Sequence, residues 1–145
     1  IAIARRALGR VTPGADLKQV NLQLTQDANL PNCATDASRV EQILINLLGN
    51  AIKYAPERSV VRLAVASSGR RILYQVEDEG PGVPPADVEQ IFDVYVTTVD
   101  DASRGLGLGL PLSRRLARLL GGELQCIARP ESGGCFVLEV PTSTL

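Results

Sequence analysis

Residues 40–54 carry the hydrophobic pattern of an amphipathic helix. The apolar residues return every three or four positions and line one face; they are Val40, Ile43, Leu44, Leu47, Leu48 and Ala51. Ser38 and Glu41 fit the S-x-x-E capping box, so the helix is expected to begin near Ser38. Pro56 requires the helix to end by Ala55.

Polar residues of the same helix are also in phase. Around the helix axis, Asn50 lies about 40° to one side of Asn46 and Lys53 about 20° to the other. Two carboxamides and an ammonium group on one strip need polar partners if the strip is buried. A polyanion with a bound divalent cation would supply them, because amide oxygens can ligate the cation and lysine can meet phosphate. Taken alone, the helix is better explained by an ordinary solvated polar face.

The rest of the chain alternates between strand and helix patterns. Residues 1–11 are expected to form a helix that Thr12-Pro13-Gly14 ends, and alternation at 20–24 predicts a strand with one buried face. Two further alternating segments, 60–66 and 71–77, predict an antiparallel hairpin. The later expected elements are a short helix at 86–92, a helix at 111–120 with Leu112, Leu116 and Leu119 or Leu120 inward, a glycine C-cap at 121–122, and strands at 123–128 and 135–140.

Composition narrows the class of protein. The 145 residues are 45% hydrophobic and 21% charged, as in a globular domain, so we expect a single domain over 1–145, with 1–11 as the tail of an upstream helical region. The net charge of −1 argues against a nucleic-acid or anionic-membrane surface. The start lacks Met and a signal-peptide pattern, as expected for an excised piece of something longer. Three unclustered cysteines indicate reduced thiols in a cytosolic domain, and the chain has no histidine.

Two glycine-containing segments suggest contact with a ligand. Residues 105–109, GLGLG, precede a helix, where clustered backbone amides can hold phosphate. The segment lacks the lysine of a P-loop and does not follow a strand directly, as a Rossmann fingerprint requires. The DEGPG loop places Asp78 at a strand end, where its carboxylate can accept a hydrogen bond from the exocyclic amine of a base and the glycines allow close approach. Taken singly, tight helix packing and a turn-capping Asp are the favoured interpretations.

The order of the motifs changes that balance. In chain order the motifs are NLLGNAIKY, DEGPG, an Ile-Phe pair, a polar loop, GLGLGL and a Gly-Gly pair before a strand. Together they resemble the catalytic, ATP-binding domain of sensor histidine kinases, which are GHKL ATPases. The resemblance covers roughly residues 36–141. It implies an α/β two-layer sandwich with a mixed sheet, helices on one face, and ATP between the helix layer and a lid. Single-faced strand alternation independently supports such a sheet.

The resemblance also implies roles for individual residues. Asn50 is expected to be the principal Mg²⁺ ligand with Asn46 beside it, and these two are the expected catalytic residues. Lys53 is expected to meet phosphate and Tyr54 to border the adenine, whose amino group would donate to Asp78. The other residues expected to bind nucleotide are Gly80, Gly82, Val83, Phe92, Arg104, Gly105, Leu106, Gly107, Leu108, Gly109 and Leu110.

The chain departs from the family pattern after Phe92. A second Phe and a basic residue often follow there, whereas this chain has Tyr95 and no Arg or Lys before Arg104. The expected lid, residues 93–104, is therefore short, and Arg104 is the candidate for holding the terminal phosphate. The phosphoacceptor histidine of such kinases sits on a separate helical hairpin that this chain does not contain.

The implied function is that of the catalytic domain of a two-component sensor histidine kinase. It would hold Mg-ATP and donate the γ-phosphate to a histidine on a dimerisation domain, from which the phosphate would pass to a response regulator. These two domains are the expected partners, with no nucleic acid and no direct membrane contact. The expected location is cytoplasmic, including the cytosolic part of a membrane-anchored sensor. The alternatives are a GHKL ATPase, a kinase of a serine on a regulatory partner, and a degenerate module that binds only nucleotide or a partner protein.

Overall fold

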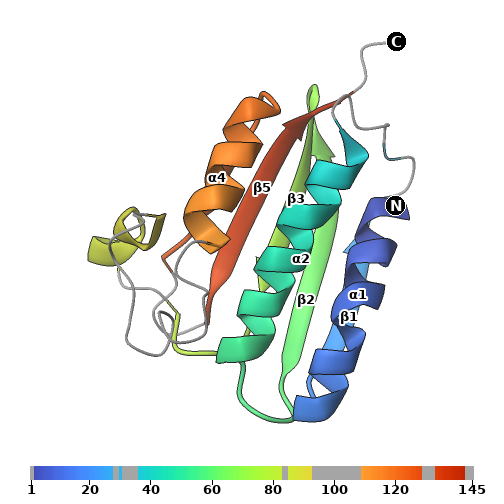
Figure 1. Cartoon of the computed structure of the whole chain (residues 1–145), viewed down its shortest axis with the longest axis vertical. Coiled ribbons are helices and arrows are strands. Elements are labelled where there is room, and N and C mark those ends of the chain that lie inside the picture. The colour runs from blue at the N-terminus through green and yellow to red at the C-terminus, as the bar shows by residue number, and fades with distance from the viewer. Residues whose placement is uncertain are drawn as a thin grey trace.

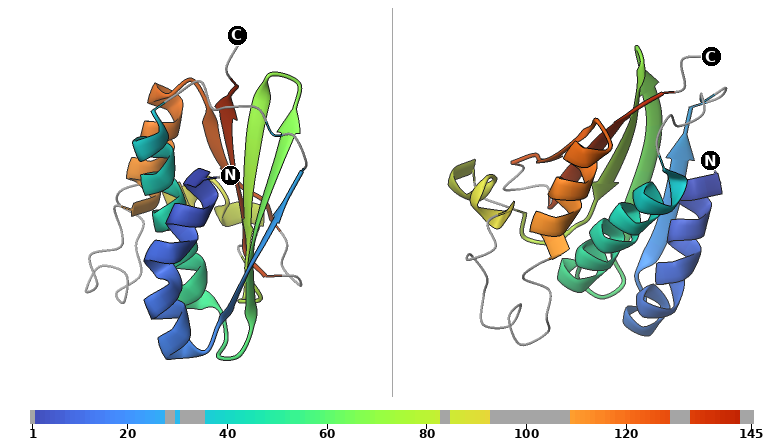
Figure 2. Two further views of the ribbon diagram at one scale, coloured as in Figure 1. Left: turned by 90° about the vertical axis from the view of Figure 1, so that its right-hand side faces the viewer. Right: turned by 45° about the horizontal axis from the view of Figure 1, so that its top comes forward.

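Three helices lie side by side over one face of a five-stranded sheet in the computed structural model, which describes residues 2–27, 30, 36–82, 85–92, 109–128 and 133–142 (Figure 1). The helices are α1 (Ala2–Lys18), α2 (Ala37–Tyr54) and α4 (Gly109–Leu119). The strands are β1 (Asn21–Gln26), β2 (Val60–Ser68), β3 (Arg71–Glu77), β4 (Glu123–Cys126) and β5 (Cys135–Pro141). Figure 2 shows the helix layer and the strand layer from the side. The predicted two-layer α/β sandwich is confirmed.

The sheet is mixed, with the strand order β1-β2-β3-β5-β4. β1 runs parallel to β2, because α2 carries the chain back across the helix face between them. The remaining pairs are antiparallel. β2 and β3 form the predicted hairpin, in which Leu63 faces Val76 and Val65 faces Tyr74. Both of these cross-strand pairs are buried beneath the helices.

Helix α2 occupies the middle of the helix layer and packs against both α1 and α4 (Figure 1). Its buried residues are Val40, Ile43, Leu44, Leu47, Leu48, Ala51 and Ile52. The predicted apolar face is therefore confirmed, and Ile52 extends it. The helix ends at Tyr54 before Pro56, as predicted.

The prediction that Thr12-Pro13-Gly14 ends the first helix is wrong. α1 continues through Pro13 to Lys18. Proline costs a helix one backbone hydrogen bond, but Val11 and Ala15 on either side of Pro13 are both buried in the core. Thr12 adds a side-chain hydrogen bond in the same turn, since its hydroxyl donates to the carbonyl of Leu8 at 2.8 Å. Tertiary packing of one continuous apolar face thus outweighs the local breaker.

The predicted capping box at the start of α2 is also wrong. The N-cap is Asp36, whose carboxylate accepts from the backbone N–H of Ser38 at 2.9 Å. Glu41 turns instead toward α1, where its Oε1 lies 3.5 Å from Nε of Arg6. That oxygen is buried without a well-aligned hydrogen bond in the described part of the chain. Asp accepts at an N-cap as readily as Ser, so the two residues competed for the cap.

The predicted inward face of α4 is confirmed for Leu116 and Leu120 and wrong for Leu112. Leu112 is 55% exposed and Leu119 is 73% exposed, whereas Ser113 and Ala117 are buried and Leu116 and Leu120 pack partly against the core. The leucines of this helix point to several sides of it, so their spacing alone did not identify the buried side. Gly121, with φ +84°, ends the helix as predicted. Residues 86–92 form two 3-10 turns, η1 (Pro85–Asp87) and η2 (Gln90–Phe92), and not one short helix.

No helix within the described ranges has the length and apolar character that crossing a membrane would require. Cys135 is buried and Cys126 is partly buried, and neither forms a disulfide within the described part of the chain, in agreement with the reduced thiols predicted from the sequence. Burial, with Cys135 and Asp78 nearby, raises the pKa of the Cys126 thiol to about 12. This thiol therefore stays protonated and unreactive at neutral pH. Cys33 lies outside the described residues.

Lys18, the last residue of α1, stabilises the C-terminal end of α2. Its ammonium donates to the carbonyls of Lys53 at 2.8 Å and Ile52 at 3.1 Å, which would otherwise have no partner within the helix. A cation at a helix C-terminus also interacts favourably with the helix dipole.

We expect Lys18→Met to lower the free energy of unfolding by about 1–2 kcal/mol, because it removes a charge-assisted hydrogen bond and a dipole interaction. Arg5→Met is the matched control, since Arg5 is an exposed cation on the same helix and its loss should change stability by no more than about 0.5 kcal/mol. Urea unfolding of both variants measures the difference. Equal destabilisation by the two substitutions would contradict the capping role.

Candidate functional site

The polar strip of α2 faces the start of α4. Asn46, in the middle of the strip, is half-buried, and its side-chain nitrogen donates to the carbonyl of Gly109 at 2.6 Å and to the hydroxyl of Ser113 at 2.5 Å. The strip is therefore not an ordinary solvated face at this position. Asn50, one turn further along, is also half-buried, and its side chain has no hydrogen bond to another described residue.

Asp78 follows directly after β3 and is 8% exposed. Its Oδ1 accepts two backbone hydrogen bonds, from Gly80 at 2.7 Å and from Gly134 at 3.0 Å. The backbone N–H of Asp78 in turn donates to the carbonyl of Gly134 at 3.0 Å. Two hydrogen bonds to the carboxylate and one from the backbone N–H thus hold Asp78 between its own loop and the segment that precedes β5.

The second oxygen of Asp78 is the atom that remains for a ligand. Among the described residues Oδ2 has no hydrogen-bond partner, and it is not a fully enclosed atom. An ionised carboxylate oxygen can only accept, so a matching ligand must present a donor such as an amino group. The amino group of adenine is a donor of this kind, and its bond to Asp78 stays a prediction.

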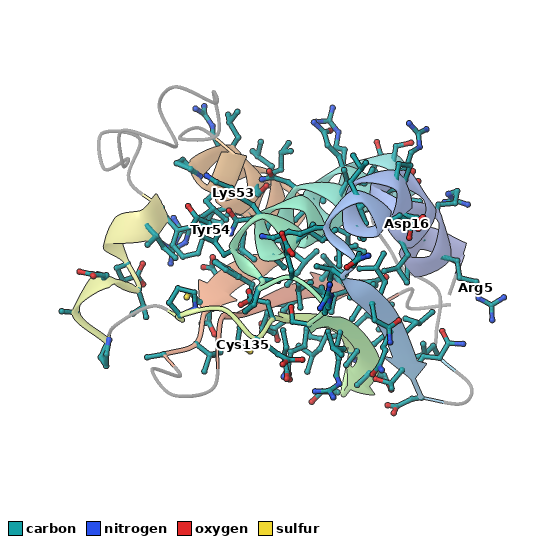
Figure 3. The ribbon with its side chains drawn as sticks, turned by 90° about the horizontal axis from the view of Figure 1, so that it is seen from below. Arg5, Asp16, Lys53, Tyr54 and Cys135 are labelled. Carbon is teal, nitrogen blue, oxygen red and sulfur yellow. The ribbon has the colours of Figure 1, made fainter. Side chains whose placement is uncertain are left out.

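The C-terminal end of α2 borders the Asp78 loop. A Cβ atom on Gly80 would lie only 2.6 Å from the backbone oxygen of Tyr54, so the loop and the helix end are in close contact. Figure 3 shows Lys53 and Tyr54 at the end of α2 that faces the 3-10 turns, far from Arg5 and Asp16 on α1. The Lys53 ammonium lies 4.8 Å from the Tyr54 ring centroid, and the Tyr54 side chain is 40% exposed. A cation and a partly exposed aromatic ring thus lie together at the helix end that contacts the Asp78 loop.

Phe92, at the end of η2, is held between β5 and α4. Its ring meets that of Phe136 edge-on, with centroids 6.3 Å apart, and the guanidinium of Arg114 lies 4.3 Å over its face. Arg114 also pairs with Glu89 and Glu123. The hydrogen bond to Glu89 raises the pKa of Arg114, and the same bond lowers the pKa of the exposed Glu89 carboxyl. Phe92 is therefore an anchor that joins η2 to β5 and α4.

The structure brings together several of the predicted site residues and leaves others untested. Asn46 meets Gly109, Asp78 meets Gly80, and Lys53 meets Tyr54. Gly82 has φ +76° in the same loop, and Leu110 packs partly against the core. The predicted residues that lie outside the described part of the chain are Val83, Arg104, Gly105, Leu106, Gly107 and Leu108, together with the predicted lid at 93–104.

Three residues support the site although no role in it was predicted for them. Ser113 and Gly134 hold Asn46 and Asp78 respectively, and Lys18 holds the end of α2. The Gly-Gly pair before β5 was a visible signal, because adjacent glycines permit a backbone to approach closely. Ser113 and Lys18 had no local signal, since their partners lie 67 and 35 residues away in the chain.

The donor set fits Mg²⁺ only as part of a complex with phosphate. Among the described residues there is no cluster of three or more His, Cys, Asp or Glu side chains that would hold a metal. The amide oxygens of Asn46 and Asn50 are hard oxygen ligands, and Mg²⁺ commonly takes one or two protein ligands together with phosphate oxygens and water. A metal would therefore enter this site with its nucleotide.

Comparisons with known proteins agree with this geometry. Residues 35–144 match the family model described as histidine kinase-, DNA gyrase B-, and HSP90-like ATPase. The sensor protein TorS of Escherichia coli (strain K12) is 41% identical over 106 residues, which are 73% of this chain and 11% of TorS. The adaptive-response sensory kinase SasA of Synechococcus sp. (strain CC9311) is 32% identical over 127 residues, 86% of this chain and 33% of SasA. The chain thus spans a third or less of the length of these two relatives.

Solved structures give the same result. Full-length ShkA in complex with AMPPNP superposes with a TM-score of 0.87 at 31% identity, over 99% of this chain and 30% of ShkA. The catalytic domain of the histidine kinase ThkA superposes with a TM-score of 0.86 at 25% identity, over 97% of this chain and 91% of that domain. The chain belongs to the histidine kinase-, DNA gyrase B- and HSP90-like ATPases, and it is a domain of the histidine kinase type, the ATP-binding catalytic domain of sensor kinases.

Proposed function

We propose that this domain binds Mg-ATP between Asp78, the C-terminal half of α2 and the start of α4, and donates the γ-phosphate to a histidine on a separate dimerisation domain. The observation that carries the proposal is the fixed Asp78 carboxylate, which keeps one oxygen available as an acceptor. Family membership supports the phosphoryl-transfer role, and the AMPPNP complex of ShkA supports the nucleotide class. ThkA has been solved in complex with the response regulator TrrA; we propose a receiver domain of that class as the downstream acceptor here.

Each group has a proposed task. Asp78 accepts the adenine amino hydrogen, Tyr54 borders the base, and Lys53 neutralises phosphate charge. Asn50, with Asn46 beside it, offers amide oxygens to Mg²⁺. Mg²⁺ held there would supply positive charge against the negative charge that develops on the phosphate during transfer. Arg104 and the glycines at 105–109 complete the proposed phosphate contacts.

The proposed unit is a single domain over residues 1–145 that works in the cytoplasm. α1 buries Ala4, Ala7 and Val11 in the common core, so residues 1–11 belong to this domain as well as forming the proposed continuation of an upstream helical region. ATP and receiver domains are both cytoplasmic, which supports that location for the catalytic domain.

The residue one helical turn before Asn50 distinguishes the proposed kinase function from the alternative of an ATPase that hydrolyses ATP rapidly. Rapid hydrolysis by the related ATPases is expected to use a carboxylate at that position to activate water, but this chain has Asn46 there. A carboxamide has no proton affinity near neutral pH and cannot act as a general base. The isolated domain is therefore expected to bind ATP and hydrolyse it very slowly.

Incubation with γ-labelled ATP tests the proposal. The domain alone should release little free phosphate and gain no acid-labile label, because it contains no histidine. Addition of a dimerisation hairpin from a sensor histidine kinase should give label on the hairpin, and the same hairpin with its acceptor His replaced by Ala should not. Rapid phosphate release by the domain alone would favour the ATPase alternative, and absence of nucleotide binding would favour a degenerate module.

A further inference from the structure

Ser113 is a buried polar residue on the inward face of α4. Its side chain is enclosed, with the residue 3% exposed, and its neighbour on that face, Ala117, is part of the hydrophobic core. The described partner of its hydroxyl is the side-chain nitrogen of Asn46, at 2.5 Å. A hydroxyl is costly to bury in such surroundings unless it makes hydrogen bonds, so this contact is the structural reason for a serine at this position.

The contact determines which atom Asn46 presents. The carbonyl of Gly109 can only accept a hydrogen bond, so the side-chain nitrogen of Asn46 must face it. The hydroxyl of Ser113 takes the second hydrogen of the same nitrogen. Both donors of the carboxamide are then used inside the protein. Oδ1 is the remaining polar atom of Asn46, and it can only accept a hydrogen bond or ligate a cation.

The contact also joins two parts of the site. Asn46 lies on α2 with Asn50, and Ser113 and Gly109 lie on the first turns of α4. Two hydrogen bonds from the Asn46 amide hold α2 in a defined position against the start of α4. With one acceptor removed, an N–H of a half-buried amide would lack a partner, and the carboxamide could rotate.

We propose that Ser113 is a positioning residue for the nucleotide site, which holds the Asn46 carboxamide with its oxygen toward the metal of Mg-ATP. The inference rests on the proposed function and adds a residue that touches neither nucleotide nor metal. Ser113 acts through Asn46, so its effect should appear in the metal-dependent part of binding and not in recognition of the base.

The first test needs no ligand. In ¹⁵N-labelled protein, the side-chain NH₂ signals of Asn46 are assigned by their loss in Asn46→Ala. In Ser113→Ala these signals should move and exchange faster with solvent, while the side-chain signals of the exposed Asn21 on β1 should stay in place. Ser113→Thr, which restores a hydroxyl, should return the Asn46 signals toward their original positions. Unchanged Asn46 signals in a folded Ser113→Ala would overturn the proposal.

The second test measures ATP affinity by calorimetry with Mg²⁺ and with EDTA. Ser113→Ala should reduce the Mg²⁺-dependent gain in affinity by about fivefold, as expected for one lost hydrogen bond, and leave the affinity in EDTA within about twofold. In an Asn46→Ala background the serine substitution should have no further effect on that gain. Equal losses in both backgrounds, or an equal loss with and without Mg²⁺, would overturn the positioning role. A wild-type domain that binds no ATP at all would instead contradict the proposed function.

Discussion

Gly133→Ala is expected to lower the free energy of unfolding by about 3 kcal/mol or more. Gly133 has φ +90°, a region that L-residues with a side chain rarely adopt. A Cβ atom there would lie 1.9 Å from the carbonyl oxygen of Asp78, which is part of the backbone. The alanine would thus have both a strained φ angle and a steric overlap with the Asp78 backbone. Either the loop before β5 or the end of β3 must therefore move.

Denaturant unfolding with Gly9→Ala as control tests this expectation. Gly9 lies within α1, and a Cβ atom on it would meet nothing within 4 Å. Its replacement should therefore stabilise the protein by about 0.5–1 kcal/mol through helix propensity. Similar unfolding midpoints for the two variants would show that the loop before β5 adapts without cost, and the tight junction at Asp78 would then have no energetic importance.

Asp78→Asn is expected to weaken ATP binding about tenfold or more while leaving the domain folded. Asn is the same size, and its oxygen can still accept from Gly80 and Gly134 as Oδ1 does now. The second position becomes an NH₂ group, which cannot accept from the adenine amino group. Loss of a charge-assisted hydrogen bond of about 1.5–3 kcal/mol corresponds to at least a tenfold change in affinity.

Calorimetric titration with ATP and GTP measures the effect. The wild-type domain should bind ATP and ADP and reject GTP, which carries a carbonyl where adenine has its amino group. Asp78→Asn should narrow that preference, because its NH₂ group can donate to the guanine carbonyl. Asp78→Ala should lose ATP affinity without any gain for GTP. Equal ATP and GTP affinities in the wild-type domain, or an Asp78→Asn variant with unchanged ATP affinity, would end the assignment of Asp78 to the base.

The sequence predicted those parts of the fold in which one local pattern dominates. The apolar face of α2 and the β2–β3 hairpin have a strong period, and no competing signal interrupts them. The prediction was wrong where two signals compete within a few residues. In α1, packing of Val11 and Ala15 outweighs Pro13. In α4, leucines on every side concealed the buried face.

Motifs in the sequence nominated the side chains of the candidate site, but they did not indicate the partners of those side chains in the fold. Asn46, Asp78 and Gly109 were identified from motifs, and the structure places Asn46 against Gly109. The role of Ser113 depends on how two helices pack, and such a contact between distant segments leaves no trace in local spacing. Gly134 is similar, since its contact with Asp78 follows from the pairing of β3 with β5.

The contact between Asp78 and Gly134 has a consequence for how the protein acquires its activity during synthesis. The two residues are 56 positions apart, and β5 is the last strand of the described chain. A ribosome-bound chain that ends before Gly134 already contains Asp78 and the whole of α2, but its carboxylate lacks one of two backbone donors and β3 lacks a neighbour. Nucleotide capture should therefore appear only when the final strand has emerged and paired. Chains that end before β5 should be unable to bind ATP. Premature termination of synthesis would therefore not produce a truncated fragment that can donate phosphate.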